Sequence, residues 1–283
     1  MRRREESGIR AVCPVCFHHC SLFEGKYGKC QARKNENGRI LSDNYGKLTA
    51  VMLDPIEKKP LRRFLPGSKI LSVGSFGCNL ACPFCQNYEI SMVGQVQVSY
   101  EKTTPEKLAQ AAYRYRKYGN VGVAFTYNEP LVGYEFVRDT AKLVHEYGMK
   151  NVLVTNGCAS ISVLEEILPW IDAMNIDLKG FSKAYYQKLG GDLESVKRFI
   201  ERAVQDCHVE LTTLIVPEEN DSLEEMELEA RWIASVDPEI PLHVTRFFPR
   251  YQMKDREATD VGHIYRLKET AGCYLSYVYT GNC

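Results

Sequence analysis

The sequence predicts an α/β protein in which parallel strands and crossover helices form a barrel or open barrel behind a small cysteine-rich module. Three observations lead to this prediction. From residue 70 onward, short apolar runs alternate with longer helical stretches. The residues before 67 are rich in Cys, Gly, Lys and turn formers and show little periodicity. No G-x-G-x-x-G follows the first apolar run. Such alternation is typical of βα units with a parallel sheet, and the missing glycine motif argues against a dinucleotide-binding sheet. We therefore expect a Cys-rich module at 1–66 and a barrel domain at 67–283.

The individual elements follow from this pattern. Strands are expected at residues 70–73, 121–125, 152–155, 173–178, 209–216, 242–247 and 274–279. Helices are expected at residues 105–118, 132–147, 162–168, 193–204 and 223–234. Pro105 suits the first turn of its helix, and Thr104 suits the N-cap position before it.

The strand at residues 173–178 indicates what lies inside the barrel. Its apolar residues alternate with Asn175, Asp177 and Lys179, so these polar side chains share one face. A barrel packed only for stability carries branched apolar residues inside. A polar inner face therefore predicts a solvated or ligand-filled lumen. The alternative is an edge strand with one face in water.

Composition and charge exclude several classes of partner. The chain has 283 residues, 45% of them hydrophobic, and a formal net charge of zero, which suits one large α/β domain with a small appendage. Zero net charge predicts no broad surface for nucleic acid or membranes. Arginines at positions 2–4 precede no apolar signal segment, and no apolar stretch is long enough to span a bilayer. We expect a cytoplasmic protein.

The cysteines form two groups, and in a cytosolic protein clustered cysteines indicate metal or redox chemistry. Cys78, Cys82 and Cys85 have the spacing C-x3-C-x2-C directly after the first barrel strand. Three close thiolates can occupy three irons of a 4Fe–4S cluster and leave the fourth iron open. A zinc site would favour paired C-x2-C knuckles, and a ferredoxin would supply a nearby fourth cysteine, whereas the next one is Cys158. The spacing therefore favours a cluster with one open iron.

This loop, with Phe84 before its last cysteine, resembles the cluster motif of the radical S-adenosylmethionine (SAM) superfamily. The resemblance implies a partial (β/α)6-type open TIM barrel and a 4Fe–4S cluster on Cys78, Cys82 and Cys85 that binds SAM. It implies reductive cleavage of SAM to methionine and a 5′-deoxyadenosyl radical, which abstracts hydrogen from a substrate. An electron donor such as ferredoxin or flavodoxin is implied as a partner.

Three later segments extend the resemblance. Residues 125–130, Phe-Thr-Tyr-Asn-Glu-Pro, stand where superfamily members often carry a Gly-Gly-Glu-like motif that meets the SAM amino group, although Tyr and Asn replace the glycines. Thr-Asn-Gly at 155–157 and Asp-Leu-Lys at 177–179 look like segments of pyruvate formate-lyase activating enzymes. The SAM contacts implied by these matches are Phe84, Asn128, Glu129, Asn156, Asp177 and Lys179.

The activating-enzyme resemblance implies a protein or peptide substrate, such as a backbone glycine of a partner enzyme. A radical SAM enzyme acting on a small molecule or another peptide is the alternative among enzymes. An iron–sulfur electron-transfer protein is the alternative from another class.

A wider resemblance covers nearly the whole chain and points to the "AmmeMemoRadiSam" radical SAM proteins. The matching segments include Cys13-Pro-Val-Cys16, Asp54-Pro-Ile-Glu-Lys-Lys-Pro-Leu61, Phe84-Cys-Gln-Asn87 and Arg246-Phe-Phe-Pro249. That group usually continues past a Gly-Asn into a further Cys-x-x-Cys, whereas this sequence ends at Gly281-Asn-Cys283. We expect Cys283 to be a free thiol.

The N-terminal cysteines Cys13, Cys16, Cys20 and Cys30 have the spacing C-x2-C-x3-C-x9-C. Four thiolates suit a closed zinc site or an auxiliary iron–sulfur cluster. Zinc is favoured, an auxiliary cluster is the rival, and a module without metal stays open. Because the module lacks apolar runs, a metal would be its main source of folding energy.

Other polar residues and cysteines carry weaker signals. His243 and Arg246 fall on opposite faces of one strand, so only one of them should enter the lumen. Cys158 and Cys207 are expected in the core rather than as ligands.

Overall fold

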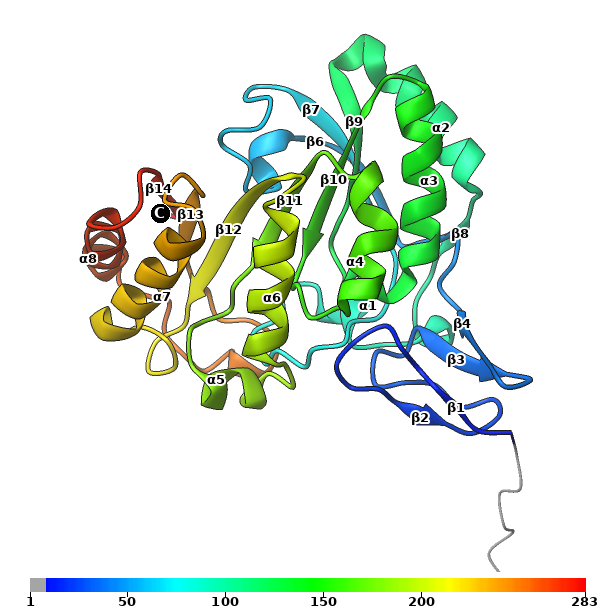
Figure 1. Cartoon of the computed structure of the whole chain (residues 1–283), viewed down its shortest axis with the longest axis horizontal. Helices are drawn as coiled ribbons and strands as arrows, with labels where there is room; N and C mark the ends of the chain where they lie inside the picture. Colours follow the sequence, from blue (N-terminus) through cyan, green and yellow to red (C-terminus); the bar gives the residue numbers. More distant parts are fainter. Residues whose placement is uncertain (1–8) are drawn as a thin grey trace, which may run out of the picture.

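The structure is a computed structural model that describes residues 9–283, so the arginines at positions 2–4 lie outside the described residues. Its centre is an eight-stranded sheet with the order β14-β13-β12-β11-β10-β9-β7-β6 (Figure 1). The neighbouring strands from β7 to β14 are parallel, and β6 alone runs antiparallel, against β7. The strands are β6 (Ala50–Pro55), β7 (Lys69–Gly74), β9 (Asn120–Phe125), β10 (Lys150–Thr155), β11 (Ala173–Asp177), β12 (His208–Ile215), β13 (Leu242–Arg246) and β14 (Val278–Gly281).

Helices follow the parallel strands and pack along the outside of the sheet (Figure 1). They are α1 (Tyr88–Ser91), α2 (Pro105–Arg114), α3 (Tyr134–Glu146), α4 (Ile161–Ile167), α5 (Lys183–Lys188), α6 (Leu193–Ala203), α7 (Leu223–Val236) and α8 (Val261–Gly272). Thr104 caps α2 as predicted, because its hydroxyl accepts a hydrogen bond from the Lys107 amide at 3.3 Å. Within residues 9–283, no helix is both long enough and apolar enough to cross a membrane.

The fold class predicted from the sequence is confirmed, with local corrections. Strand β11 lies between β10 and β12, so the edge-strand alternative is wrong. The last strand begins at Val278 rather than 274, because Tyr274 and Leu275 are bonded to Ala271 in the turn that ends α8. The helix predicted at 105–118 changes at Tyr115 into a 3-10 turn, which Gly119 ends at φ 87°. Helices α1, α5 and α8 were not predicted.

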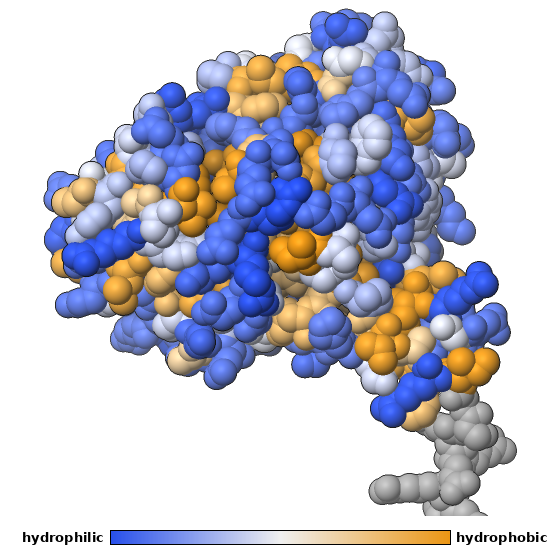
Figure 2. Space-filling view, in the orientation of Figure 1, coloured by the Kyte–Doolittle hydropathy of each residue, from blue (hydrophilic) through white to orange (hydrophobic). Residues whose placement is uncertain are grey.

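The N-terminal module consists of short antiparallel pairs: β1 (Ala11–Val12) with β2 (Ser21–Leu22), β3 (Arg33–Glu36) with β4 (Arg39–Ser42), and β5 (Lys47–Leu48) with β8 (Glu101–Lys102). Figure 2 shows apolar atoms on the surface of this part of the molecule, and Ile9, Val12 and Leu41 are exposed there. The module contacts the barrel through the buried Arg33, whose guanidinium lies 2.6 Å from the Glu135 carboxylate on α3. Its own core is therefore small, and part of its order comes from this contact.

Residues 50–66 were expected in the module, yet they contribute to the sheet. Strand β6 pairs with β7 over its whole length. The following 3-10 turn η1 (Ile56–Lys58) brings Ile56 and Leu61, both fully buried, against Ile70 and Val152 inside the barrel. Burial of these side chains explains why the segment joins the barrel. The structure thus moves the first sheet strand to Ala50, and the division into two domains stays a prediction.

Candidate active site

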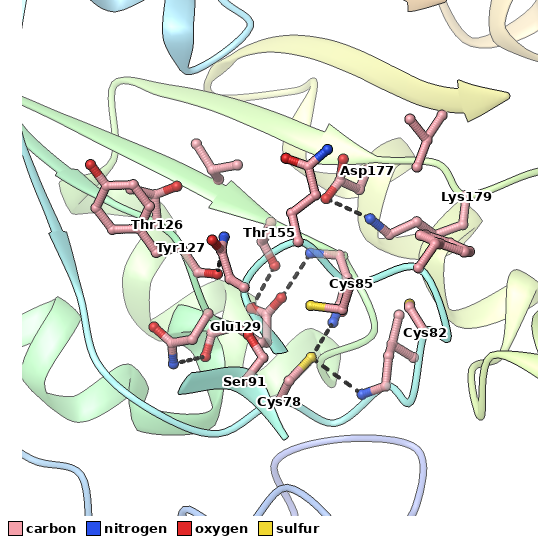
Figure 3. A pocket seen from close by; sticks show the side chains of 18 of the residues that line it. Cys78, Cys82, Cys85, Ser91, Thr126, Tyr127, Glu129, Thr155, Asp177 and Lys179 are labelled. Atoms are coloured by element: carbon pink, nitrogen blue, oxygen red, sulfur yellow. Dashed lines mark hydrogen bonds and ion pairs between the residues drawn. The ribbon is translucent and has the colours of Figure 1, made fainter. Parts of the chain in front are cut away.

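The cysteine loop, residues 75–87, joins the carboxyl end of β7 to α1. Cys78, Cys82 and Cys85 line a cavity of about 280 Å³ together with groups from the carboxyl ends of the next strands (Figure 3). Residues on these strands and their loops that also line it include Tyr127, Asn128, Glu129, Thr155, Asn156, Asp177, Lys179, Thr212 and Thr245. Because the strands are parallel, their carboxyl ends meet at one edge, where such barrels place their active sites.

Gly77 fixes how the cysteine loop lies against the N-terminal module. Its φ is 89°, a conformation that favours glycine. A Cβ atom added there would lie 2.4 Å from the Cys30 carbonyl oxygen and 2.9 Å from the Ala32 Cβ. The backbone of the module therefore packs directly on the residue before Cys78.

Asn128 holds the start of the cysteine loop. Its Oδ1 accepts a hydrogen bond from the Ser75 amide at 2.9 Å, and its Nδ2 donates to the carbonyls of Phe76 at 3.2 Å and Gly77 at 3.0 Å. The Glu129 amide adds a bond to the Gly77 carbonyl at 3.3 Å. The amide that sequence analysis expected to meet SAM is thus engaged by the loop itself.

Glu129 ties the ends of β9 and β10 together. Its carboxylate accepts hydrogen bonds from the Leu131 amide at 3.0 Å, the Thr155 hydroxyl at 2.7 Å and the Asn156 amide at 2.8 Å. Burial raises the pKa of this carboxyl to about 7, although the three hydrogen bonds oppose the shift. Three of the four acceptor positions of the carboxylate are therefore already used by the protein.

Tyr127 closes one side of the cavity with a strained backbone, at φ 71°. Its hydroxyl donates to the Asp54 carboxylate at 2.8 Å, and the buried Lys59 ammonium lies 2.9 Å from the same oxygen. A side chain at Gly74 would lie 2.8 Å from the Tyr127 ring, so glycine makes room for it. This network connects β6 to the wall of the cavity.

Asp177 and Lys179 face the cavity from the end of β11, as the alternation predicted. The Lys179 ammonium lies 2.8 Å from the Asp177 carboxylate (Figure 3). Burial disfavours the charged ammonium, but Asp177 and the Cys82 thiol outweigh burial and raise the pKa of Lys179. Within residues 9–283 neither side chain makes another hydrogen bond, so both retain bonding capacity toward the cavity.

The thiols of the cysteine loop have the chemistry of iron–sulfur ligands. Burial raises the pKa of Cys82 to about 11 and raises that of Cys78 as well. Iron displaces the proton from a coordinating thiol and so overcomes such a shift. Three thiols on one loop beside a cavity fit a cluster with an open iron. No group of three or more His, Cys, Asp or Glu side chains among residues 9–283 is already arranged around a metal position.

The N-terminal cysteines lie near one another on the side of the module that meets the cysteine loop. Cys13, Cys16 and Cys30 are buried and Cys20 is partly buried. Burial raises the pKa of Cys16 to about 11, with smaller contributions in the same direction from Cys30 and Cys13. In the described part of the chain, these four cysteines are likewise not already arranged around a metal position.

Of the remaining sequence-derived candidates, His243 enters the lumen and lies 2.7 Å from the buried Glu210, whereas Arg246 donates to the Thr259 carbonyl outside it. Cys158 is fully buried, Cys207 is partly buried and Cys283 is exposed. Sequence analysis missed the role of Gly77, because nothing in the cysteine spacing distinguishes this glycine from other loop residues.

Comparison with known proteins identifies the family. A family model described as the Radical SAM superfamily matches residues 72–230, more than half of the chain. The chain belongs to this superfamily, whose members use SAM and a 4Fe–4S cluster, as the sequence predicted.

Three relatives illustrate the range of similarity. The chain is 38% identical to the uncharacterized protein MJ0808 of Methanocaldococcus jannaschii, over 95% of this chain and 80% of that protein. It is 29% identical to the pyruvate formate-lyase-activating enzyme of Clostridium pasteurianum, over 56% of this chain and 67% of that enzyme. The structure of Streptococcus suis SuiB bound to S-adenosylmethionine matches with a TM-score of 0.59 at 14% identity, over 76% of this chain and 52% of SuiB, and shows the fold alone.

Proposed function

We propose that this protein is a radical SAM enzyme of the activating-enzyme type, which abstracts a hydrogen atom from a protein or peptide. The observation that carries the proposal is the convergence of three thiols, Asp177 and Lys179 on one cavity at the carboxyl ends of parallel strands. An electron carrier needs no cavity beside its cluster, and this one adjoins the cysteines. An electron-transfer protein is therefore the weaker alternative.

In this proposal Cys78, Cys82 and Cys85 hold the 4Fe–4S cluster and leave one iron free for SAM. When bound and reduced, a cluster held there would supply the electron for cleavage of SAM to methionine and a 5′-deoxyadenosyl radical. A ferredoxin or flavodoxin would deliver the electron. The zero net charge of the chain favours neither a nucleic acid nor a membrane as a partner.

The other residues divide into binding and positioning roles. Lys179 and Asp177 have free bonding capacity and bind the charged or ribose groups of SAM. Phe84, which is buried beside the thiols and lines the cavity, packs against bound SAM. Asn128 and Glu129 act mainly by holding the cysteine loop and the ends of β9 and β10, because protein groups occupy most of their hydrogen-bonding positions.

The proposed substrate class rests on similarity to the activating enzyme of C. pasteurianum and on the segments at 155–157 and 177–179. A structure of SuiB carries a bound precursor peptide and shares the fold, with a TM-score of 0.57. A backbone glycine of a partner enzyme is the first candidate target. A small molecule or a different peptide is the alternative substrate within the same chemistry.

The experiment is anaerobic reconstitution with iron and sulfide, followed by reduction in the presence of SAM. We expect 5′-deoxyadenosine to form and SAM to change the EPR spectrum of the reduced cluster. The Cys82→Ala variant should lose both signals. Cys273→Ala removes an exposed thiol and is the matched control that should keep both. A reduced wild-type protein that forms no 5′-deoxyadenosine contradicts the proposal.

The substrate is tested separately, with a purified glycyl-radical-type enzyme offered as the substrate. Transfer of deuterium from α-deuterated glycine in that enzyme to 5′-deoxyadenosine, together with a protein radical in the EPR spectrum, would support a protein substrate. Deuterium transfer only from small molecules would favour the alternative.

We also propose that Cys13, Cys16, Cys20 and Cys30 hold one structural metal, with zinc favoured over an auxiliary cluster. The module has a small core and exposed apolar residues, so a closed four-thiolate site would supply stability that packing does not. A measured content of about four irons and one zinc per chain would support zinc in the module. A content of about eight irons without zinc would support a second cluster.

The stabilising role has its own test. The double variant Cys13→Ala, Cys16→Ala should keep the cluster of the cysteine loop but lose the order of the module under limited proteolysis, whereas Cys273→Ala should resemble the wild type. Equal protease resistance of the double variant and the wild type would contradict a structural metal.

A further inference from the structure

Two side-chain amides connect the N-terminal cysteine group to the first cysteine of the cysteine loop. The Asn79 side chain lies close enough to the Cys16 thiol of the module to lower the pKa of that thiol, against the larger effect of burial. The Asn79 Oδ1 accepts a hydrogen bond from the Asn156 Nδ2 at 2.9 Å. The same Nδ2 lies 3.7 Å from the Cys78 Sγ and donates its second proton there. Hydrogen bonds thus lead from Asn79, which lies beside the N-terminal cysteine group, through Asn156 to Cys78.

The orientation of both amides is fixed by further bonds. The Asn156 Oδ1 accepts a hydrogen bond from the Cys158 amide at 2.9 Å, and the Asn79 Nδ2 donates to the Cys158 carbonyl at 3.1 Å. Rotating the Asn156 amide by half a turn would place donors against donors and acceptors against acceptors. Both asparagines are at least nine-tenths buried, which strengthens each bond and makes its loss costly.

The module contacts the same place through its backbone. The His18 ring lies 2.9 Å from the Asn79 carbonyl, the Ser160 amide donates to the Val15 carbonyl at 2.9 Å, and Cys16 forms an isolated β-bridge with Ala159. Gly77 packs on the Cys30 carbonyl from the other side. A displacement of Cys16 would therefore also shift the position of Asn79.

We propose that Asn79 and Asn156 form an amide relay through which the N-terminal cysteine group tunes the cluster held by Cys78. The inference rests on the proposed function, because it requires a cluster on the cysteine loop. An N–H donor to a cluster-ligating sulfur stabilises the extra negative charge of the reduced state and raises the reduction potential. Asn156 is the positioning residue that makes this bond, and Asn79 links it to the module.

The test is an EPR-monitored redox titration of the anaerobically reconstituted full chain. Asn156→Ala should shift the midpoint potential of the SAM-binding cluster to more negative values and change the EPR spectrum of its reduced form. Asn79→Ala and Cys16→Ala should shift the potential in the same direction by a smaller amount. Asn151→Ala is the matched control, because Asn151 is a buried asparagine at the opposite end of β10, bonded to the Ala141 carbonyl. The midpoint potential of the cluster in Asn151→Ala should equal that of the wild type.

The outcomes separate the relay from the proposed function. A wild-type protein whose reduced cluster does not respond to SAM would remove the proposed function itself. A SAM-responsive cluster with equal potentials in Asn156→Ala and Asn151→Ala would overturn the relay alone. A shifted midpoint potential in Asn156→Ala, together with unchanged potentials in Asn79→Ala and Cys16→Ala, would also overturn the relay. Asn156 would then affect the cluster without any influence from the module. Should Asn156→Ala fail to load iron, Asn79→Ala and Cys16→Ala decide the matter, because both leave the Asn156 bond to Cys78 in place.

Discussion

Replacing Glu210 with Gln should destabilise the protein by about 3 kcal/mol at neutral pH, because this buried carboxylate closes the end of the barrel opposite the cysteine loop. Its Oε2 accepts hydrogen bonds from the Arg62 amide at 2.9 Å and from the His243 ring at 2.7 Å. Its Oε1 accepts from the Arg63 amide at 2.8 Å and the His208 ring at 3.0 Å. One side chain thereby anchors the segment that fills the barrel end to β12 and β13.

Two independent routes give this magnitude. A glutamine has one acceptor oxygen, so its NH2 group would face two donors, and each hydrogen bond to a charged group contributes roughly 1.5–3 kcal/mol. The second route is the pKa. Burial favours the neutral acid, but the two histidines and the two backbone amides outweigh it and lower the pKa of Glu210 to about 2. A depression of that size from the ordinary value of about 4.3 corresponds to about 3 kcal/mol.

The pH dependence has a definite sign. Because the folded pKa lies below the unfolded one, the stabilisation by Glu210 is fully present above about pH 4.5 and is lost as the pH falls toward 2. The Glu210→Gln variant lacks this contribution. The difference in stability between wild type and variant should therefore be largest at neutral pH and shrink on acidification.

The assay is urea denaturation of both proteins at several pH values, with Glu201→Gln as a control, since Glu201 is an exposed residue on α6. The control should stay within about 0.5 kcal/mol of the wild type. A Glu210→Gln protein as stable as this control at neutral pH, or one whose deficit is unchanged at acid pH, would refute the reasoning.

Three further predictions concern single residues. Gly77→Ala places a Cβ 2.4 Å from the Cys30 carbonyl at a φ of 89°, so it should cost at least about 1–3 kcal/mol in a denaturation experiment, and an unchanged midpoint would contradict the packing of module on loop. Lys179→Met removes a charge that faces the cavity and should weaken SAM binding about tenfold or more in equilibrium dialysis. Unaltered affinity would exclude Lys179 as a contact. Burial raises the pKa of Glu229 to about 8, so its contribution to stability is fully present below about pH 4.5 and is lost as the pH rises through 8. In Glu229→Gln the free energy of unfolding should decline less over this pH range. An unchanged slope of stability against pH would contradict the raised pKa.

Apolar periodicity predicted most of the barrel because each buried strand must present apolar side chains to helices outside it. Strands β7 and β9 to β13 therefore lie where the apolar runs are. Strand β6 escaped prediction because it is half exposed and ends in Asp54-Pro55, which resembles a turn in sequence. Helices α5 and α8 carry many polar residues, and α5 is a single short segment, so neither shows a long apolar stripe.

The site was predicted as a set of residue types rather than as a set of partners. Alternation along one strand placed Asp177 and Lys179 in the lumen, because strand geometry fixes the side on which a residue lies. Nothing comparable fixes what an amide or a carboxylate will bond. Asn128 and Glu129 were expected to meet SAM, yet the backbone of the cysteine loop and the end of β10 take up most of their hydrogen-bonding capacity.

The same limit explains why the link between the two cysteine groups was not foreseen. Asn79 and Cys16 are separated by more than sixty residues, and their contact depends on how the module docks. That docking depends on Gly77, which lets the module backbone approach, and on Arg33, which pairs with Glu135 on α3. Each of these residues has an ordinary local role in the sequence, as a loop glycine or a charged strand residue. Only their joint placement brings a thiol of the module close to Cys78, with the Asn79 and Asn156 side chains between the two. The surroundings of the Cys78 sulfur, and of a cluster bound there, would therefore depend partly on the N-terminal module.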